Sequence, residues 1–389
     1  MRLAVVTPLD AAQTGVADYS RDLLPFLAEA VGRDIHVFTD RASLGQSGVG
    51  WSVGPIDELP LAARTFDLII YQLGNSPAHD FMAEAARDYP GLIVLHDISL
   101  HYFFARQTRS RYLQAMGYGY GTAGTALGRR FLQEFVSVNY PAYLVSEAVV
   151  DRSLGTIVHS RHAFDLLQLR CPNARLYQVP MPVPLPPDRP PATARAQLHL
   201  NGADFLIGVF GVLNDSKQPQ AILTAMRRLL DEGMPVKAVF IGRENDSVHL
   251  ANEAQHLGLS DQIISLGFVD DLTVINNWLV ACDVAINLRA PYWGETSAST
   301  LRILAAGVPV VVNRVGAFAE LPDEACIKLP PAGPDLSRQL TDALRDLYIR
   351  AEQRVSMRLA ARQYIAVEHE PSRVAVRYLD AVRSILEAA

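Results

Sequence analysis

The chain has 389 residues, of which 49% are hydrophobic and 20% charged, and its formal net charge is −6. This length suits two domains with separate cores, and the composition is typical of a globular protein. The negative charge argues against broad nucleic-acid binding, and no apolar run reaches the ~18 residues that a membrane-spanning helix needs.

The cysteines and the first residues indicate a cytoplasmic protein. Cys171, Cys282 and Cys326 stand far apart in apolar surroundings, so we expect reduced core side chains. The segment Met1–Pro8 lacks the long apolar stretch of a signal peptide and predicts a buried strand. No paired spacing of cysteine and histidine suggests zinc, so we expect no metal site.

Short apolar runs alternate with amphipathic stretches along residues 1–180. We predict a helix over Gly15–Ala30, where leucines recur on one face, and parallel strands at the apolar runs. These strands are Leu3–Thr7, Ile35–Phe38, Leu68–Tyr71, Ile93–His96 and Thr156–His159. Strands that alternate with helices indicate an α/β domain with a doubly wound parallel sheet.

Prolines concentrate between Val179 and Pro191 and exclude a helix or a central strand there, so we predict a stiff linker over residues 181–200. The alternation then restarts and predicts a second α/β domain over residues 201–368. Its strands are Phe205–Phe210, Val236–Ile241, Ile263–Leu266, Val284–Leu288 and Val308–Val312. Its helices are Pro219–Asp231, Asp271–Ala281, Ser299–Ala306, Asp335–Leu347 and Ala351–Ile365.

A last amphipathic helix, Pro371–Leu386, occupies the segment 369–389. Two Rossmann-like halves joined by a hinge imply a ligand cleft between them, lined by the carboxyl ends of the strands.

The segment Arg289–Val312 is the most informative part of the sequence, because a hydroxyl-rich loop leads into a short apolar helix. Ser297, Ser299 and Thr300 stand where this helix begins, so their hydroxyls can cap free amides and an anion can bind there. Glu295 stands just before them as an acceptor for sugar or ribose hydroxyls. The segment predicts a diphosphate site beside a sugar; the alternative is a loop with a well-capped helix.

A second segment opens the second domain with a strand, Gly211, a loop and Lys217 before a helix. Lysine occurs only at positions 217, 237 and 328, although arginine is abundant, so each lysine deserves a test for a role that arginine cannot fill. We predict that Lys217 supplies a compact positive charge to a leaving phosphate. The alternative is a solvated loop lysine.

Polar residues also follow the strands of the first domain. His96 and Asp97 end the strand at 93–96, where a neutral imidazole can hold a sugar hydroxyl. His79, beyond the strand at 68–71, is a second cleft candidate; the alternative for either histidine is a hydrogen-bonded core side chain. Gly15 would let a ligand approach the backbone, or belongs to an ordinary strand–helix loop, and the three glycines of a dinucleotide fingerprint are absent.

Aromatic residues, arginines and glycines concentrate in Tyr102–Tyr112 and in Gly117–Gly124. This composition could meet a lipid-linked acceptor at a membrane surface. The alternative, a helix with a solvated basic face, is the one that we favour.

Taken in order, these motifs resemble glycosyltransferase family 4, the retaining nucleotide-sugar enzymes of the GT-B fold. The resemblance covers nearly the whole chain and is closest to a bacterial branch with Gly-Glu-Thr-Ser, here residues 294–297. Its motifs are the Gly15 loop, Tyr71–Asn75, His96–Asp97, Val158–Ser160, the proline linker, Gly211 with Lys217, Gly267–Asp271, Gly307–Val310, Gly316 with Glu320, and the last helix. It implies two Rossmann-like domains that face each other across a cleft, with the last helix returning to the first domain.

The chain departs from the family pattern at two places. The usual pair of glutamates falls on Gly294 and Arg302, where Glu295 would replace the first and nothing obvious replaces the second. The phosphate-binding arginine falls on Val212, and the residues that would restore its charge are Arg289, Arg243 and Arg302.

The resemblance implies transfer of a hexosyl group from a UDP- or GDP-sugar with retention of the anomeric configuration, in which the leaving phosphate helps to take the acceptor proton. Lys217 and Glu295 would act on the donor, and His96 would position its sugar. The donor would also contact Gly15, Gly211, Arg243, Arg289, Thr296, the amides of Ser297, Ala298, Ser299 and Thr300, and, at the base, Phe268 and Val269.

A glycan or lipid-linked glycan acceptor would bind Asn75, His79 and Asp97 of the first domain. Because the sequence has no Asp-x-Asp motif, we expect no metal and no other cofactor. The analogy suggests bacterial surface-polysaccharide assembly in the cytoplasm, at the inner face of the plasma membrane. Two alternatives keep the fold: a nucleotide-sugar isomerase or hydrolase, and a non-catalytic pseudo-transferase that acts as a binding subunit.

Overall fold

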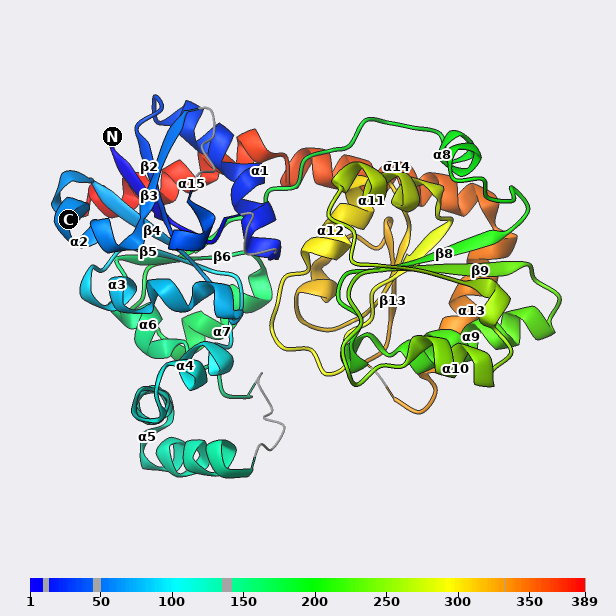
Figure 1. The fold of residues 1–389 in the computed structure, drawn as a ribbon, viewed down its shortest axis with the longest axis horizontal. Helices are drawn as coiled ribbons and strands as arrows, with labels where there is room; N and C mark the ends of the chain where they lie inside the picture. Colours follow the sequence, from blue (N-terminus) through cyan, green and yellow to red (C-terminus); the bar gives the residue numbers. More distant parts are fainter. Residues whose placement is uncertain (10–13, 45–49, 135–141, 332, 389) are drawn as a thin grey trace. The chain divides into compact units, whose positions relative to one another are not determined.

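The computed structural model describes residues 1–9, 14–44, 50–134, 142–331 and 333–388 (Figure 1). Its internal contacts divide the chain into two units. Unit 1 comprises Met1–Pro182, Trp293–Thr296 and His369–Ala389, and unit 2 comprises Val183–Tyr292 and Ser297–Glu368. Each unit has a parallel sheet with helices on both faces, which confirms the predicted doubly wound α/β class.

Within its described residues, unit 1 is built on a seven-stranded sheet in the order β3-β2-β1-β4-β5-β6-β7, and every neighbouring pair is parallel. All positions of β1, β4, β5 and β6 are buried, as expected for parallel strands that helices cover on both faces. The strands are β1 Leu3–Val6, β2 Ile35–Thr39, β3 Trp51–Pro55, β4 Leu68–Leu73, β5 Leu92–Leu95, β6 Gly155–Val158 and β7 Leu176–Gln178.

The last helix of the chain completes unit 1. Helix α15 (Pro371–Leu386) packs along α1 (Gly15–Ala30), where the hydroxyls of the buried residues Tyr19 and Tyr378 share a hydrogen bond (Figure 1). The other helices of unit 1 are α2 Leu59–Ala62, α3 Ala83–Asp88, α4 His101–Gln107, α5 Arg109–Glu134, α6 Glu147–Arg152 and α7 Arg161–Arg170.

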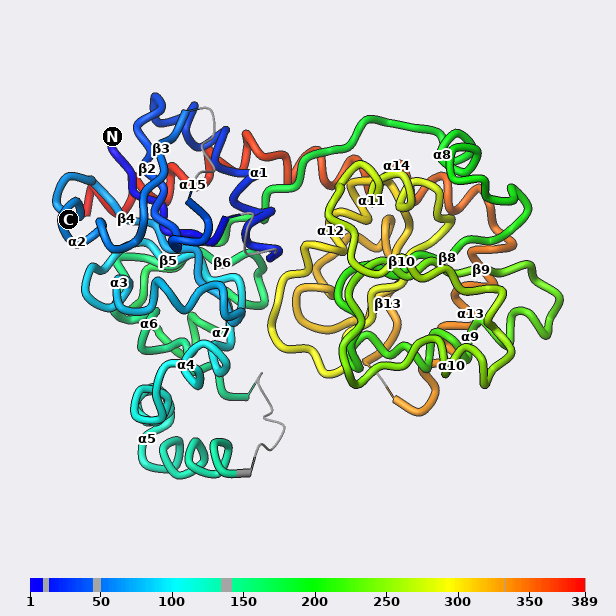
Figure 2. Tube along the Cα trace, viewed as in Figure 1, coloured from blue at the N-terminus to red at the C-terminus, as the bar shows by residue number. Residues whose placement is uncertain are grey.

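Helix α5 turns back on itself at Gly121, whose φ of 63° and ψ of −152° interrupt the helix (Figure 2). A Cβ atom on Gly124 would lie 2.3 Å from the carbonyl oxygen of Met116, and one on Gly117 would lie 2.7 Å from Thr125 Oγ1. The glycine run between residues 117 and 124 therefore lets the two halves of α5 pack closely.

Unit 2 has a six-stranded parallel sheet among its described residues, in the order β10-β9-β8-β11-β12-β13. The strands are β8 Phe205–Phe210, β9 Val236–Ile241, β10 Ile263–Gly267, β11 Val284–Ile286, β12 Val310–Asn313 and β13 Cys326–Leu329. The helices are α8 Pro191–Gln197, α9 Pro219–Asp231, α10 Leu250–His256, α11 Leu272–Ala281, α12 Ala298–Ala305, α13 Leu336–Ile349 and α14 Ala351–Glu368. The core lies between this sheet and α9, α10 and α13.

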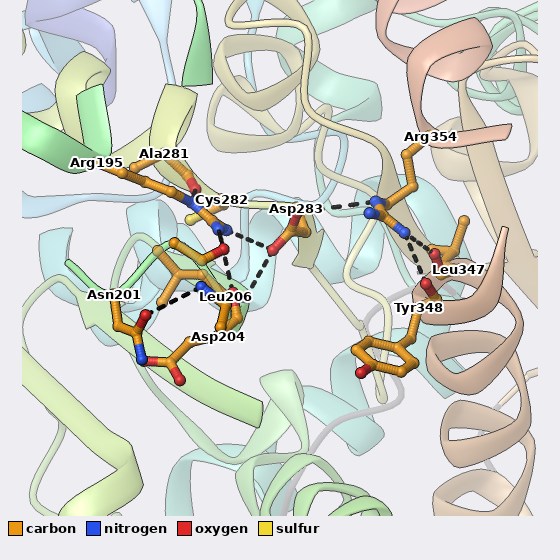
Figure 3. Close-up of polar contacts among 12 residues, drawn as sticks. Arg195, Asn201, Asp204, Leu206, Ala281, Cys282, Asp283, Leu347, Tyr348 and Arg354 are labelled. Carbon is orange, nitrogen blue, oxygen red and sulfur yellow. Dashed lines mark hydrogen bonds and ion pairs between the residues drawn. The ribbon is translucent and has the colours of Figure 1, made fainter. Parts of the chain in front are cut away.

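The predicted linker ends in a short helix, α8, which begins at Pro191 because proline suits the first helical position. An ion-pair cluster attaches α8 to the sheet (Figure 3). Asp283 Oδ2, just before β11, accepts from Arg195 Nη2 of α8 at 2.5 Å and from the amide of Leu206 at 2.8 Å. Arg354 of α14 lies 3.8 Å from the other oxygen of Asp283, so one carboxylate connects α8, β8 and α14.

Candidate functional site

The hydroxyls at the start of α12 form one network around Asn287, which follows β11 and is 1% exposed. The side-chain nitrogen of Asn287 donates to Ser297 Oγ at 3.1 Å, Ser299 Oγ at 3.0 Å and Thr300 Oγ1 at 2.5 Å. Ser297 also caps α12, because its Oγ accepts from the amide of Thr300 at 3.3 Å. An amide has two N–H donors, so the three hydroxyls share them and are held in one place.

The guanidinium of Arg289 is fixed to the same network. Its Nη1 donates to Asn287 Oδ1 at 2.6 Å and to the carbonyl of Leu288 at 2.7 Å. Its backbone amide donates to Asn313 Oδ1 at 2.8 Å, and its guanidinium carbon lies 5.6 Å from the ring centroid of Phe318. The structure therefore attaches a cation to the asparagine that organises the start of α12.

Lys217 is 3% exposed, and its ammonium donates to the carbonyl of Phe210 at the end of β8. Gly211 follows with a φ of 86°. A Cβ atom on Gly211 would lie 3.2 Å from Lys217 Nζ and 3.6 Å from Ser299 Oγ. The glycine, the ammonium and the hydroxyl cluster thus meet in unit 2, and a side chain at position 211 would intrude between them.

The other two arginines that were candidates to replace the family's missing cation have different surroundings. Arg243 follows β9, and its guanidinium carbon lies 5.6 Å from the ring centroid of Phe268, which is 47% exposed. Phe268 and the half-buried Val269 follow Gly267, whose carbonyl accepts from the amide of Gly242 at 2.8 Å. Arg302 lies in the last turn of α12.

In unit 1, two candidate histidines are held by one glutamine. His96 Nε2, beyond the end of β5, lies 2.8 Å from Gln72 Oε1, and His79 Nδ1 donates to the carbonyl of Gln72 at 2.9 Å. Burial lowers the pKa of His96 well below its usual value and lowers the pKa of His79 to about 4. Both imidazoles are therefore neutral at pH 7.

Asn75 and Asp97 also come together in unit 1, around Gly74. Asp97 Oδ2 accepts from the amide of Asn75 at 2.7 Å, and a Cβ atom on Gly74 would lie 3.1 Å from this oxygen and 3.0 Å from His79 Nε2. Burial raises the pKa of Asp97 to about 6, although the hydrogen bond from Asn75 opposes this rise. Asn75 Oδ1 further accepts from the amide of Phe103 at 3.2 Å, so Asn75 fixes the start of α4.

Two further candidates, Glu295 and Thr296, belong by their contacts to unit 1. There Glu295 forms an isolated antiparallel bridge with Asp97, and its Oε2 accepts from the amide of Trp293 at 3.1 Å. A Cβ atom on Gly294 would lie 2.1 Å from Ile98 Cγ2, which is a physical reason for glycine where the family has glutamate.

The last candidate, Gly15, is the first residue of α1, which Thr14 caps. A Cβ atom on Gly15 would have no neighbour within 4 Å, so packing does not require glycine there. Residues 10–13 of the preceding loop lie outside the described residues.

The sequence analysis assigned no role to Asn287 and included Gln72 only within the Tyr71–Asn75 motif, yet these two amides organise the clusters. Each is a buried polar residue at the carboxyl end of an otherwise apolar run. Ligands bind at this end of the strands in open α/β sheets, so the position of a lone polar residue was the signal.

The described parts of the chain contain no group of three or more histidine, cysteine, aspartate or glutamate residues that could hold a metal ion. Within the same residues, no helix combines the length and apolarity needed to cross a membrane. The three cysteines are buried and free, as predicted.

Part of the second unit is similar to known glycosyltransferases. Residues 204–349 match the family model described as Glycosyl transferases group 1. Over 135 residues the chain is 33% identical to the lipopolysaccharide core biosynthesis mannosyltransferase LpsB of Rhizobium meliloti (strain 1021). This match covers 33% of the chain and 36% of the length of LpsB.

Solved structures resemble the chain over nearly its whole length. Sucrose-phosphate synthase from Thermosynechococcus elongatus has a TM-score of 0.73 at 16% identity, with 100% of both chains covered. Alr3699/HepE of Anabaena, in complex with UDP-glucose, has a TM-score of 0.66 at 16% identity over 99% of this chain and 100% of its own. WaaG, a glycosyltransferase involved in lipopolysaccharide biosynthesis, has a TM-score of 0.60 at 14% identity over 98% and 99% of the two chains.

These comparisons confirm the predicted GT-B type of fold and the predicted resemblance to glycosyltransferases. The narrower assignment, to family 4 and to its branch with the Gly-Glu-Thr-Ser motif, stays a prediction.

Proposed function

We propose that the protein transfers a hexosyl group from a nucleotide-diphosphate sugar to a glycan or lipid-linked glycan, with retention and without a metal ion. The group 1 match and the GT-B type of fold support a glycosyltransferase. The observation that carries the donor assignment is the network at the start of α12, where Asn287 holds three hydroxyls beside Lys217. The structure of HepE with UDP-glucose supports a nucleotide-sugar donor by analogy.

The chemistry of this network suits a diphosphate. The free amides and the dipole at the start of α12 attract an anion, and hydroxyls and cations donate charge-assisted hydrogen bonds to phosphate oxygens. Lys217 and Arg289 add two positive charges in a partly buried setting, where electrostatic stabilisation is stronger than in water. Together they would supply the charge that a divalent metal provides elsewhere.

In the proposed reaction, the bond between the anomeric carbon and the phosphate oxygen breaks, and negative charge develops on the diphosphate. Lys217 and the α12 amides stabilise this charge more in the transition state than in the bound donor. The acceptor oxygen attacks on the face that the phosphate leaves, and its proton passes to the leaving phosphate. No protein base is needed for this step.

We assign the acceptor to unit 1, where His79, Asn75 and Asp97 meet around Gly74. The neutral imidazole of His96 would hold a hydroxyl of the donor sugar. The similarity to LpsB, whose name places it in lipopolysaccharide core biosynthesis, supports surface-polysaccharide assembly as the context. Cytoplasmic location at the inner membrane face is part of this proposal.

The test combines donor binding with product analysis. UDP- and GDP-sugars are titrated by calorimetry, and radiolabelled donors are then incubated with and without a bacterial glycan acceptor. We expect one nucleotide sugar to bind and to release nucleotide only with acceptor. Free sugar or an epimer formed without acceptor would instead indicate a hydrolase or isomerase, and no binding would indicate a pseudo-transferase.

Two variants test whether Lys217 stabilises the leaving diphosphate. Lys217→Met should lose most turnover while the protein stays folded, because methionine fills a similar buried volume without the charge. The matched control is Lys237→Met on β9, whose ammonium pairs with Asp204 at 2.8 Å. Equal turnover in both variants would refute the role of Lys217, and loss of activity with a chelator would refute metal-independent transfer.

A further inference from the structure

Unit 1 contains a cavity of about 420 Å³ between the ends of β4 and β5 and the helices α3, α4, α5 and α6. Small-molecule sites occupy roughly 300–1,000 Å³, so this volume is sufficient for a ligand. The walls are mostly apolar and include Leu73, Ile93, Phe103, Phe104, Ala115 and Val149. The proposed function uses none of these side chains.

One polar group in the wall lacks a partner. Gln107 Nε2 is buried and makes no hydrogen bond with any residue that the structure describes, whereas Gln107 Oε1 accepts from Arg111 Nη1 at 3.1 Å. If the side-chain amide of Gln107 were flipped, its N–H group would face the N–H group of Arg111. Two donors cannot bond to each other, so the orientation with Oε1 toward Arg111 is fixed. A buried N–H without an acceptor is unfavourable, and a ligand oxygen in the cavity would satisfy it.

The charged side chains that line the cavity are all positive among the described residues. Arg87, Arg111 and Arg152 line the cavity, and no acidic residue stands among its described lining residues. Arg87 pairs with Asp88 at 2.7 Å and Arg111 with Glu84 at 3.3 Å. The carboxylates of both pairs are exposed to water, which weakens the pairs, so an anionic group can replace them.

We propose that this cavity binds a lipid phosphate with a single alkyl chain. The chain lies among the aromatic and aliphatic walls, and a phosphate oxygen accepts from Gln107 while the arginines balance its charge. The apolar walls suit the alkyl chain of such a molecule, and the buried amide of Gln107 with the basic lining suits its phosphate. The site lies wholly in unit 1 and its test measures binding, so its outcome is independent of glycosyl transfer.

The experiment titrates the full chain by calorimetry with two probes that share a tail, dodecyl phosphate and dodecyltrimethylammonium, below their micellar concentrations. We expect one molecule of dodecyl phosphate to bind per chain, with a Kd at least ten-fold lower than that of the cation. Equal affinity for the two probes, or no binding of dodecyl phosphate, would overturn the proposal.

Variants then locate the site. Ala86→Phe fills the cavity from α3 and should weaken dodecyl phosphate binding at least ten-fold, whereas Ala251→Phe on the exposed side of α10 should leave it unchanged. Unchanged binding in Ala86→Phe would overturn the proposal.

A second variant, which removes the charge of two arginines in the lining, keeps the proposal testable if the cavity-filling variant fails to fold. The double variant Arg87→Gln/Arg152→Gln should weaken dodecyl phosphate binding several-fold and leave the cation unaffected. The matched control, Arg338→Gln/Arg383→Gln, removes two exposed arginines elsewhere. Equal affinities in the double variant and its control would contradict the location.

Discussion

Replacing Asn287 with aspartate tests the proposed diphosphate site, because it changes charge with almost no change in shape. The three hydroxyl oxygens lie 2.5, 3.0 and 3.1 Å from Asn287 Nδ2. A phosphate oxygen that accepts from such a hydroxyl lies about 2.7 Å further, hence about 5.5 Å from the new carboxylate. Two unit charges at that distance repel by about 3 kcal/mol at an effective dielectric constant of about 20, which is roughly a 150-fold change in Kd. Arg289, 2.6 Å from Asn287 Oδ1, offsets part of this repulsion.

We therefore expect Asn287→Asp to weaken the binding of UDP or GDP, whichever the protein binds, by about 10- to 100-fold in calorimetry. Hydroxyls can rotate to donate to the carboxylate, so the thermal midpoint should change little. The control is Asn313→Asp, at the end of the neighbouring strand β12, where the side chain accepts from the backbone of Arg289 but contacts no hydroxyl of this cluster in the described contacts. Equal weakening by the two variants, or less than three-fold weakening by Asn287→Asp, would refute the placement of the diphosphate.

Three further predictions concern stability. Burial lowers the pKa of His101 to about 4, so between pH 6.5 and 4 the unfolded chain binds a proton that the folded chain excludes, and stability falls as the pH falls. His101→Gln should remove about 1.4 kcal/mol per pH unit from this slope in urea unfolding; an unchanged slope would exclude His101 as the source. Asp283→Ala leaves Arg195, whose side chain is 12% exposed, without its carboxylate and should lower the unfolding free energy by about 2–4 kcal/mol, against less than about 1 for the exposed Asp231→Ala. Ser297→Ala removes the cap of α12 and should cost about 1 kcal/mol, whereas Ser299→Ala keeps the cap and should cost less; equal costs would contradict the capping assignment.

Three of the predicted helices, at 15–30, 219–231 and 371–386, agree with α1, α9 and α15 to the residue. The strands that escaped prediction are β3, β7 and β13, and each lies at the edge of its sheet. Edge strands are covered on fewer sides, and the burial of these three is mixed. A search for continuous apolar runs therefore finds the centre of a parallel sheet more readily than its rim.

The candidate site was predictable in part for the same physical reason. Hydroxyls at the start of a helix and a lysine after a glycine are local signals, and the structure brings Lys217, Gly211 and Ser299 together in unit 2. The bonds from Asn287 to the three hydroxyls join residues 10 to 13 positions apart, and the bond between Gln72 and His96 joins residues 24 positions apart, so no local pattern records them. The contact of this glycine-containing segment with a membrane surface stays a prediction, whereas the structure shows that Gly117 and Gly124 let the two halves of α5 pack closely.

The order of segments in unit 1 has a consequence for synthesis in the cell. Tyr378 of α15 is fully buried against Tyr19 of α1, yet 359 positions separate them along the chain. On the ribosome, residues 1–182 emerge long before α15. The flank of unit 1 that α15 covers, along α1, therefore stays exposed to solvent while unit 2 is translated. A chaperone that shields this flank, or early folding of unit 2, would shorten the interval in which the nascent chain is open to aggregation.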